Sequence, residues 1–307
     1  MVKRVLDLNT SDLEDMDKEN ILSSIKAAEG RTIASEIIGV APPLLADVSN
    51  VEFAANFGAD LLLLNIYDVN EPIIKGLPNG KGEGVIKEIK NLTGRIIGVN
   101  LEPVDMDSDI IDKREELPEG RLGNLENIEK LVDHGADMVV FTGNPKTGVT
   151  NDEIIKSIKV TKENFGDKLI IVAGKMHAAG SPDEAGSKII TKDIVKDFIN
   201  AGCDIILLPA PGTVPGMTIE YVRNLVEYTH SLGMMTLTTI GTSQEGADEQ
   251  TIRNIGLYSK MTGTDIHHLG DAGMSTGMAT PENIMIYSIA IRGKRHTYRR
   301  MVRSVNR

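Results

Sequence analysis

The feature that most constrains the fold is a repeated unit in which a glycine is followed closely by an apolar run. The apolar runs show no clear alternation, which is typical of parallel strands whose two faces are both covered. The unit occurs eight times, in residues 30–40, 58–67, 94–103, 135–143, 166–174, 202–210, 233–241 and 263–270. We expect each of these segments to contain one strand.

Amphipathic stretches with helix-start signals lie between the runs. Ser49 with Glu52 and Thr150 with Glu153 match the capping box, and Pro281 stands where a first helical turn tolerates proline. Glycines at the helix ends suit a left-handed cap. Eight parallel strands joined by helices predict an α/β chain folded as a single (β/α)8 TIM barrel. The alternative, a doubly wound open sheet, would show a GxGxxG turn after its first strand, and residues 39–50 lack one.

The sequence predicts two parts. Residues 1–29 are expected to be an N-terminal helical extension that closes the bottom of the barrel, and residues 30–307 the barrel domain with a basic C-terminal helix. The net charge is −11, yet the segment from Arg292 onward holds seven Lys or Arg residues and no acid. We expect these cations to pair with acids of the body, with a phosphate or RNA contact as the alternative.

Composition excludes several classes of protein. Cys203 is the one cysteine, which rules out an intrachain disulfide and a thiolate metal cluster. The N-terminus turns acidic where a signal peptide needs an apolar stretch, and no window reaches the roughly 18 apolar residues of a membrane span. We therefore expect a cytoplasmic protein without a membrane partner. The acidic body disfavours nucleic acid, while a homo-oligomer stays open.

Candidate catalytic residues follow from position, because the carboxyl ends of barrel strands form the active site. Glu102 and Lys175 are charged residues within apolar strand segments, where charge is expensive unless paired or used. Glu102 shares strand parity with Asn100, and Lys175 with His177, so each pair is expected to face the mouth. Lys175 is the predicted amine or base, Glu102 its charge partner and His177 a proton shuttle. The alternative is a purely structural Lys175–Glu102 salt bridge.

Two loops rich in small residues follow the last two predicted strands. Their backbone N–H groups are suited to holding a phosphate, and we expect a small, anionic substrate. The residues concerned are Gly241, Thr242, Ser243, Gly270, Ala272 and Gly273. No Lys or Arg lies in these loops, so ordinary glycine-rich turns are the alternative.

A divalent metal is the one cofactor that the sequence suggests, through Glu36, Glu102, His177 and His268. His267 and His268 are adjacent, so only one of them can face the barrel interior. No spacing matches a known metal motif, and packed or surface histidines are the alternative.

The glycine loops and the Gly-Ala-Asp strand starts resemble those of phosphate-binding (β/α)8 barrels: sugar-phosphate isomerases, epimerases, lyases and aldolases. The chain is also similar to an uncharacterised bacterial barrel family sometimes labelled haloacid-dehalogenase-like hydrolase. That label would imply an aspartate nucleophile in an hhhhDxDxT motif. Residues 104–109 are the nearest string, but Asp109 stands in the threonine position and a proline precedes the string. Neither resemblance transfers a catalytic residue.

These observations favour a lyase, aldolase or isomerase acting on a phosphorylated sugar or a similar carbonyl compound. Two other functions stay open: a metal-dependent hydrolase, and a non-catalytic barrel that senses a ligand and binds a partner through its basic tail.

Overall fold

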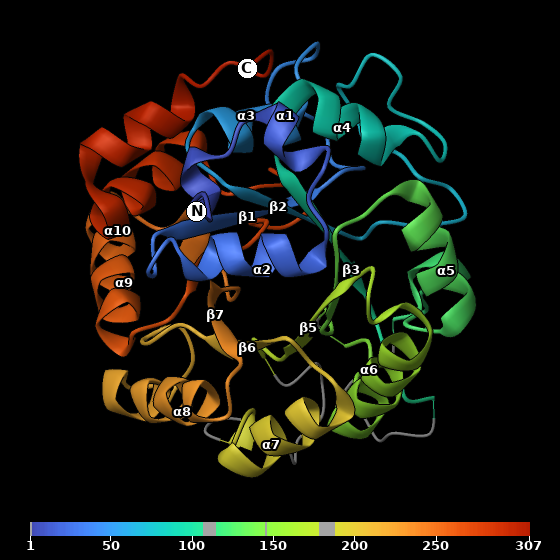
Figure 1. Cartoon of the computed structure of the whole chain (residues 1–307), viewed down its shortest axis with the longest axis vertical. Coiled ribbons are helices and arrows are strands. Elements are labelled where there is room, and N and C mark those ends of the chain that lie inside the picture. Colours follow the sequence, from blue (N-terminus) through green and yellow to red (C-terminus); the bar gives the residue numbers. More distant parts are fainter. Residues whose placement is uncertain (1, 107–114, 145, 178–187) are drawn as a thin grey trace.

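Eight parallel strands close into one barrel in the computed structural model, which describes residues 2–106, 115–144, 146–177 and 188–307 (Figure 1). The expected TIM barrel is confirmed, and each strand lies inside one of the eight predicted segments. Neighbouring strands follow chain order, and β8 pairs with β1. The strands are β1 Thr32–Ile38, β2 Leu61–Asn65, β3 Ile96–Leu101, β4 Met138–Phe141, β5 Ile170–Gly174, β6 Ile205–Pro209, β7 Met235–Ile240 and β8 Ile266–Leu269.

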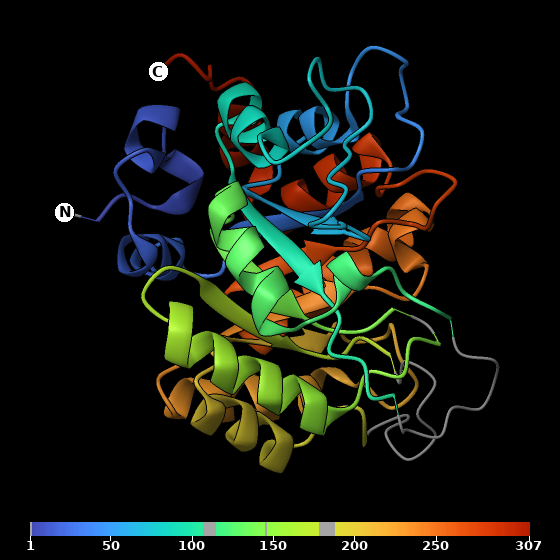
Figure 2. The same ribbon diagram turned by 90° about the vertical axis from the view of Figure 1, so that its right-hand side faces the viewer.

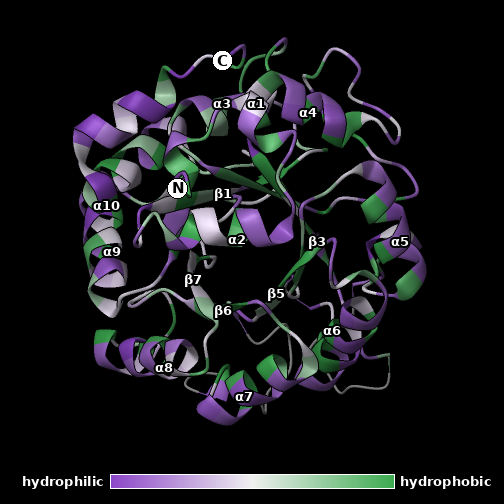
Figure 3. Ribbon diagram, in the orientation of Figure 1, coloured by the Kyte–Doolittle hydropathy of each residue, from purple (hydrophilic) through white to green (hydrophobic). Residues whose placement is uncertain are grey.

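Helices surround the barrel, and their outer faces are largely hydrophilic (Figure 3). They are α1 Thr10–Leu13, α2 Lys18–Lys26, α3 Asn50–Asn56, α4 Val85–Thr93, α5 Leu125–His134, α6 Asn151–Phe165, α7 Lys192–Ala201, α8 Ile219–Ser231, α9 Glu249–Thr262 and α10 Pro281–Met301. Short 3-10 turns are η1 Val5–Asp7, η2 Glu119–Arg121 and η5 Gln244–Gly246. The last helix is kinked at Gly293, whose φ of 74° lies in the left-handed region. None of the described helices is long and apolar enough to cross a membrane.

The caps largely follow the sequence. Ser49 and Glu52 form the reciprocal capping box at the start of α3, and Thr280 caps α10 with Pro281 at its first position. Thr150 accepts the Glu153 N–H at 3.4 Å, but the Glu153 carboxylate turns to Lys156. Only half of the second predicted box is therefore formed.

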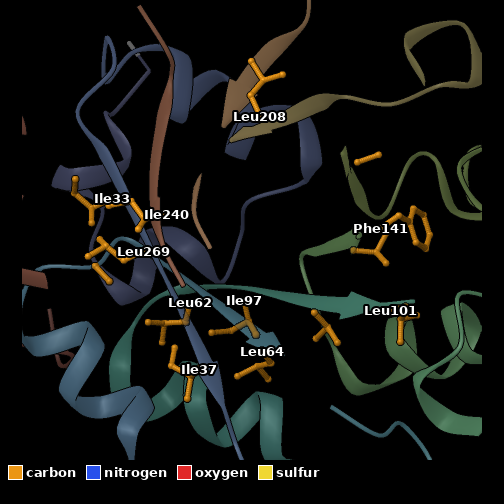
Figure 4. Close-up of a cluster of buried hydrophobic side chains, with 14 of the residues drawn as sticks. Ile33, Ile37, Leu62, Leu64, Ile97, Leu101, Phe141, Leu208, Ile240 and Leu269 are labelled. Atoms are coloured by element: carbon orange, nitrogen blue, oxygen red, sulfur yellow. The ribbon is translucent and has the colours of Figure 1, made fainter. Parts of the chain in front are cut away.

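Strand side chains alternate between two apolar layers. In β2, Leu61 and Leu63 belong to the cluster inside the barrel, whereas Leu62 and Leu64 pack in the cluster between the barrel and the helices. Figure 4 shows part of this outer cluster, which includes Ile97 and Phe141. Burial of both faces explains why the strand segments read as continuous apolar runs.

The N-terminal segment closes the bottom of the barrel. Val5, Leu6, Ile21 and Ile25 are buried in the same apolar cluster as the strand residues of the barrel interior. In Figure 1, α2 crosses that end, and in Figure 2 the N-terminal helices lie opposite the arrowhead of β3. This arrangement leaves the carboxyl ends of the strands as the open face.

Two cations of the C-terminal helix, Arg292 and Arg300, lie inside the protein. Asp60 pairs with Arg292 Nη1 at 2.6 Å and with Arg300 Nε at 3.0 Å, and the three side chains are at most 1% exposed. Arg303 donates to the Asp7 carbonyl and to Asn9 Oδ1. These cations therefore attach the C-terminal segment to the barrel and to the N-terminal segment. The expected pairing with acids of the body is confirmed for Arg292 and Arg300.

We expect Asp60→Asn to lower the free energy of unfolding by about 3–5 kcal/mol, because it leaves two buried guanidinium groups without their carboxylate. Urea denaturation followed by circular dichroism measures the loss. The matched control is Glu163→Gln, an exposed residue of α6, which should change stability by less than about 0.5 kcal/mol. A loss below about 1 kcal/mol for Asp60→Asn would show that the cluster is not essential.

Candidate active site

A cavity of about 270 Å³ opens at the carboxyl ends of the strands. Its wall combines side chains that follow strands far apart in the sequence, as the barrel rule predicts. The polar residues that line it are Glu36, Asn65, Asn100, Thr142, Asn144, His177, Ser243, Glu245 and Asp271. No Lys or Arg of the described residues is among the lining side chains, so the mouth is acidic.

Three asparagine side chains form a network across the mouth. Asn65 Oδ1 accepts from Asn100 Nδ2 at 3.0 Å and from Asn144 Nδ2 at 3.1 Å. Asn65 Nδ2 donates to Asp271 Oδ2 at 2.8 Å, which joins the loop after β8 to the loop after β2. The network leaves Asn100 Oδ1, within a residue only 4% exposed, without a hydrogen-bond partner. A buried acceptor without a donor is available to a ligand.

Glu102 is held by partners other than Lys175. Its Oε1 pairs with Arg121 Nη2 at 2.5 Å, and its two oxygens also accept from the Asn144 side chain at 3.0 Å and backbone N–H at 2.9 Å. Glu102 does not line the cavity. The carboxylate therefore positions Asn144, and Arg121 supplies the charge partner that the sequence analysis had assigned to Lys175.

Lys175 is the first residue after the end of β5, where strand alternation no longer fixes the direction of a side chain. The lysine does not line the cavity, contrary to the predicted orientation. It is 1% exposed, and burial lowers its pKa to about 8.

His177 does line the cavity, as predicted. Burial, followed by the positive charge of Lys175, lowers the pKa of His177 to about 4. The imidazole is therefore neutral at pH 7 and can accept a proton or a hydrogen bond.

Carboxyl groups dominate the opposite wall. Burial, and then the negative charges of Asp271, Glu245 and Glu102, raise the pKa of Glu36 well above its ordinary value. Asp271 is in contrast held by two donors, Asn65 Nδ2 and the Gly273 N–H, each at 2.8 Å. The cavity therefore places a carboxyl group with a raised pKa near one whose two oxygens each accept a hydrogen bond.

The two glycine-rich loops do meet at the mouth. Gly241, Ser243, Gly270, Ala272 and Gly273 all line the cavity. Thr242 does not line it, because its hydroxyl donates to the Thr213 carbonyl at 2.8 Å. The predicted phosphate-binding loops are thus brought together, while phosphate binding itself stays a prediction.

Backbone strain gathers at the same place. Ile66, Ser243 and Ala272 have φ values of 56°, 78° and 56° and all line the cavity. A β-branched residue such as Ile66 is rarely found in the left-handed region. Strained residues of this kind concentrate at functional sites, so the backbone independently marks this cavity.

The predicted metal ligands do not come together as a set. In the ranges that the structure describes, no group of three or more His, Cys, Asp or Glu side chains could hold a metal ion. His268 Nε2 lies 3.6 Å from Glu36 Oε2, and its Nδ1 is 2.6 Å from the Thr239 hydroxyl. Burial lowers the pKa of His268 to about 3. The metal-dependent hydrolase gains no support from these positions.

His267 faces the opposite side of β8. Its ring packs against Tyr287 of α10, and its Nε2 is 3.1 Å from the Gly30 carbonyl oxygen. The adjacent pair is thus divided between the barrel interior and the helical layer, as strand geometry requires.

Some residues of the site were missed or underrated by sequence reasoning. Arg121 comes from η2 in the long connection after β3, where nothing in the sequence indicates that it returns to Glu102. Glu245 and Asp271 lie in or beside the predicted phosphate-binding loops, but the sequence analysis assigned them no role. Their position beside the predicted loops was the available signal.

The fold and the site define a (β/α)8 barrel with a polar cavity at the carboxyl ends of its strands, the usual place for an active site in this class of protein. Within that class, the chain belongs to the family described as a domain of unknown function (DUF7916), whose model matches residues 6–307. No curated protein is significantly similar to the chain in sequence.

Solved structures of similar fold are distant in sequence. An archaeal fructose 1,6-bisphosphate aldolase is 13% identical, with a TM-score of 0.54 over 89% of this chain and 98% of that chain. A structure of such an aldolase with its catalytic lysine bound to a carbinolamine intermediate is 12% identical, with a TM-score of 0.56 over 89% and 98%. A 2,3-dimethylmalate lyase of the PEP mutase/isocitrate lyase superfamily is 11% identical, with a TM-score of 0.51 over 84% and 81%.

At these identities the likeness shows the fold alone. Nothing among the matches supports the haloacid-dehalogenase-like label that the sequence analysis considered. The string nearest to that motif runs to Asp109, and its residues 107–109 lie outside the described residues.

We predict that the protein loses stability as the pH falls from 7 to 5. Burial lowers the pKa of His267 to about 4. Between about pH 6.5 and pH 4, this histidine is therefore protonated in the unfolded chain but neutral in the folded chain. At pH 5 this difference amounts to roughly 2 kcal/mol for one histidine. The loss begins below pH 6.5 and continues until the pH reaches the folded pKa.

The measurement is urea denaturation at the two pH values for the wild type and for His267→Gln. The substitution should reduce the difference in stability between pH 7 and pH 5 by roughly 2 kcal/mol. Comparing the two proteins cancels the opposite contribution of Glu36, whose raised pKa stabilises the fold as the pH falls. An unchanged pH dependence in His267→Gln would contradict the assignment.

Proposed function

We propose that the chain is an enzyme that breaks or rearranges bonds beside a carbonyl group, as an aldolase-type lyase or an isomerase. The observation that carries this proposal is a pair of carboxyl groups in unlike environments within one cavity. Burial and neighbouring charge raise the pKa of Glu36, while Asp271 accepts hydrogen bonds from Asn65 Nδ2 and the Gly273 N–H. Two carboxyl groups in unlike environments are suited to general acid and general base catalysis.

The chemistry needs one proton donor and one proton acceptor. Asp271 takes the proton from the carbon next to the carbonyl, and the electron pair of that C–H bond forms the enol double bond. Glu36 gives its proton to the carbonyl oxygen, so charge does not build up on that atom. Return of that proton to the former carbonyl carbon, with loss of the proton of the neighbouring hydroxyl to Glu36, gives an isomer. In the lyase branch Asp271 instead takes the proton of the β-hydroxyl, that oxygen becomes a carbonyl as the carbon–carbon bond breaks, and the electron pair of this bond forms the enol whose oxygen Glu36 protonates.

Other lining residues are suited to holding the substrate. Asn100 Oδ1 and the Thr142 hydroxyl are buried in the cavity wall and lack hydrogen-bond partners. Hydroxyl groups of a small carbonyl compound would satisfy both atoms. The asparagine network, fixed from behind by Glu102 and Arg121, would keep these contacts in one orientation.

The role of Lys175 distinguishes a Schiff-base lyase from an isomerase that works through an enol. The structures of similar fold include a Schiff-base-forming fructose-1,6-bisphosphate aldolase and such an aldolase with its catalytic lysine bound to an intermediate. In this chain Lys175 has a pKa lowered to about 8 by burial, so an appreciable fraction is an unprotonated amine at neutral pH. In the lyase branch this amine attacks the carbonyl carbon, and loss of water gives the imine. Lys175 would have to turn toward the cavity for this step.

We expect the wild type to exchange the α-protons of a small hydroxycarbonyl compound with D2O, and Glu36→Gln to slow that exchange by at least about 100-fold. Proton NMR with glyceraldehyde, dihydroxyacetone and glycolaldehyde measures the exchange. Glu163→Gln makes the same substitution on the exposed surface and should behave as the wild type. Equal rates for Glu36→Gln and wild type would remove Glu36 from the chemistry.

For the aldolase branch, we expect borohydride to trap a reduced adduct of the same carbonyl compounds on Lys175. Mass spectrometry of proteolytic fragments locates the added mass. Lys175→Ala should lose both the adduct and the turnover, while Lys188→Ala, which changes another lysine beyond β5, should keep them. Unchanged turnover in Lys175→Ala would rule out the Schiff-base role and leave an enolising isomerase.

A further inference from the structure

The two loops expected to hold a phosphate already contain a carboxyl group of the protein. Glu245 lies in η5, directly after the loop that follows β7, and is 5% exposed. A Cβ atom built on Gly270 would lie 3.7 Å from the carboxyl carbon of Glu245. The side chain therefore reaches across from the β7 loop to the start of the β8 loop.

Backbone N–H groups of both loops act on this carboxyl group. Those of Ser243 and Ala272 favour its charged form, as does the N–H of Glu245 itself. They are outweighed by burial, which raises the pKa of Glu245, with the nearby charge of Asp271 adding to the increase. In loops that bind phosphate, backbone amides of this kind face the anion, and here the Glu245 carboxyl group lies beside them.

We infer that the Glu245 carboxyl group occupies the anion position of the β7 and β8 loops, so that the substrate presents hydroxyl or ammonium donors there and not a phosphate. That the ligand is a substrate rests on the function proposed above. The position of Glu245 in the loops does not depend on that function. The inference replaces the phosphorylated sugar expected from sequence with an unphosphorylated compound.

Independent atoms in the cavity favour the same class of ligand. Glu245 Oε2 has no hydrogen-bond partner although it is buried, and Asn100 Oδ1 is in the same condition. Both atoms are acceptors within a cavity wall, and a ligand that fills it must bring donors if these atoms are to be satisfied. A phosphate dianion offers acceptors only and would add charge beside Asp271.

The charges of the residues that line the cavity also favour a ligand that brings hydrogen-bond donors. Glu36, Glu245 and Asp271 line the cavity, while the described lining residues include no Lys or Arg. A phosphate-binding site would normally add a cation to its backbone donors. Arg121 is occupied by Glu102 at 2.5 Å and does not line the cavity. The two loops thus have the geometry of a phosphate-binding site, but the acidic side chains around them favour a ligand that brings hydrogen-bond donors.

Isothermal titration calorimetry with inorganic phosphate at pH 7.5 tests the inference on the whole chain. We expect no saturable binding to the wild type in the millimolar range, and at least tenfold tighter binding to Glu245→Gln, whose side-chain amide cannot ionise and offers N–H donors. Glu163→Gln should match the wild type. Circular dichroism verifies folding, and Glu245→Ala provides a second variant in which the anion position is vacated.

A second titration uses ethanolamine, which carries both a hydroxyl and an ammonium group, with binding followed by saturation-transfer NMR. The wild type should bind it, and both Glu245 variants should bind it at least tenfold more weakly. Millimolar or tighter phosphate binding to the wild type would overturn the inference, and so would the lack of any gain in both Glu245 variants. Neither titration depends on turnover, so a failure of the proposed catalytic role of Glu36 would be seen separately.

Discussion

The structure depends on the alternation of side chains in a closed parallel sheet. Each strand sends every second residue into the barrel interior and the others into the layer beneath the helices. Apolar residues fill both layers over most of the strand length, but the interior layer turns polar where the strands end, at Glu36, Asn65 and Asn100. The apolar layers fix the frame, and the polar layer above them becomes a cavity whose residues have little freedom to move.

Electrostatics gives this cavity its character. Two positive groups nearby do not line the cavity: Arg121 forms an ion pair with Glu102, and Lys175 is buried behind the wall. The acids therefore share the cavity without a cation among the described lining residues, and burial raises the pKa of both Glu36 and Glu245. These properties agree with the acid–base function proposed above and with a ligand that brings N–H or O–H donors.

Sequence reasoning predicted the barrel because the repeat of glycine and apolar run reports burial on both faces, which is a property of each strand taken alone. The positions of Glu36, His177 and the two glycine loops at the mouth could also be predicted, because residues at the carboxyl ends of barrel strands lie there. Lys175 and His177 were expected to face the mouth together, but only His177 lines the cavity, because both residues follow the end of β5 and strand alternation does not extend to them. Arg121 and the turn of Glu245 into the loops depend on long-range contacts, for which one sequence contains no local signal.

The buried ion pairs of Asp60 with Arg292 and Arg300 connect the residue just before β2 to the last helix, α10. During synthesis, Asp60 emerges long before Arg292 and Arg300, and burying its carboxylate alone would be strongly unfavourable. The nascent chain should therefore keep this end of the barrel open until α10 has left the ribosome. Closure of the ring would then be a late, concerted event, and truncated chains would be exposed to proteolysis before they could fold.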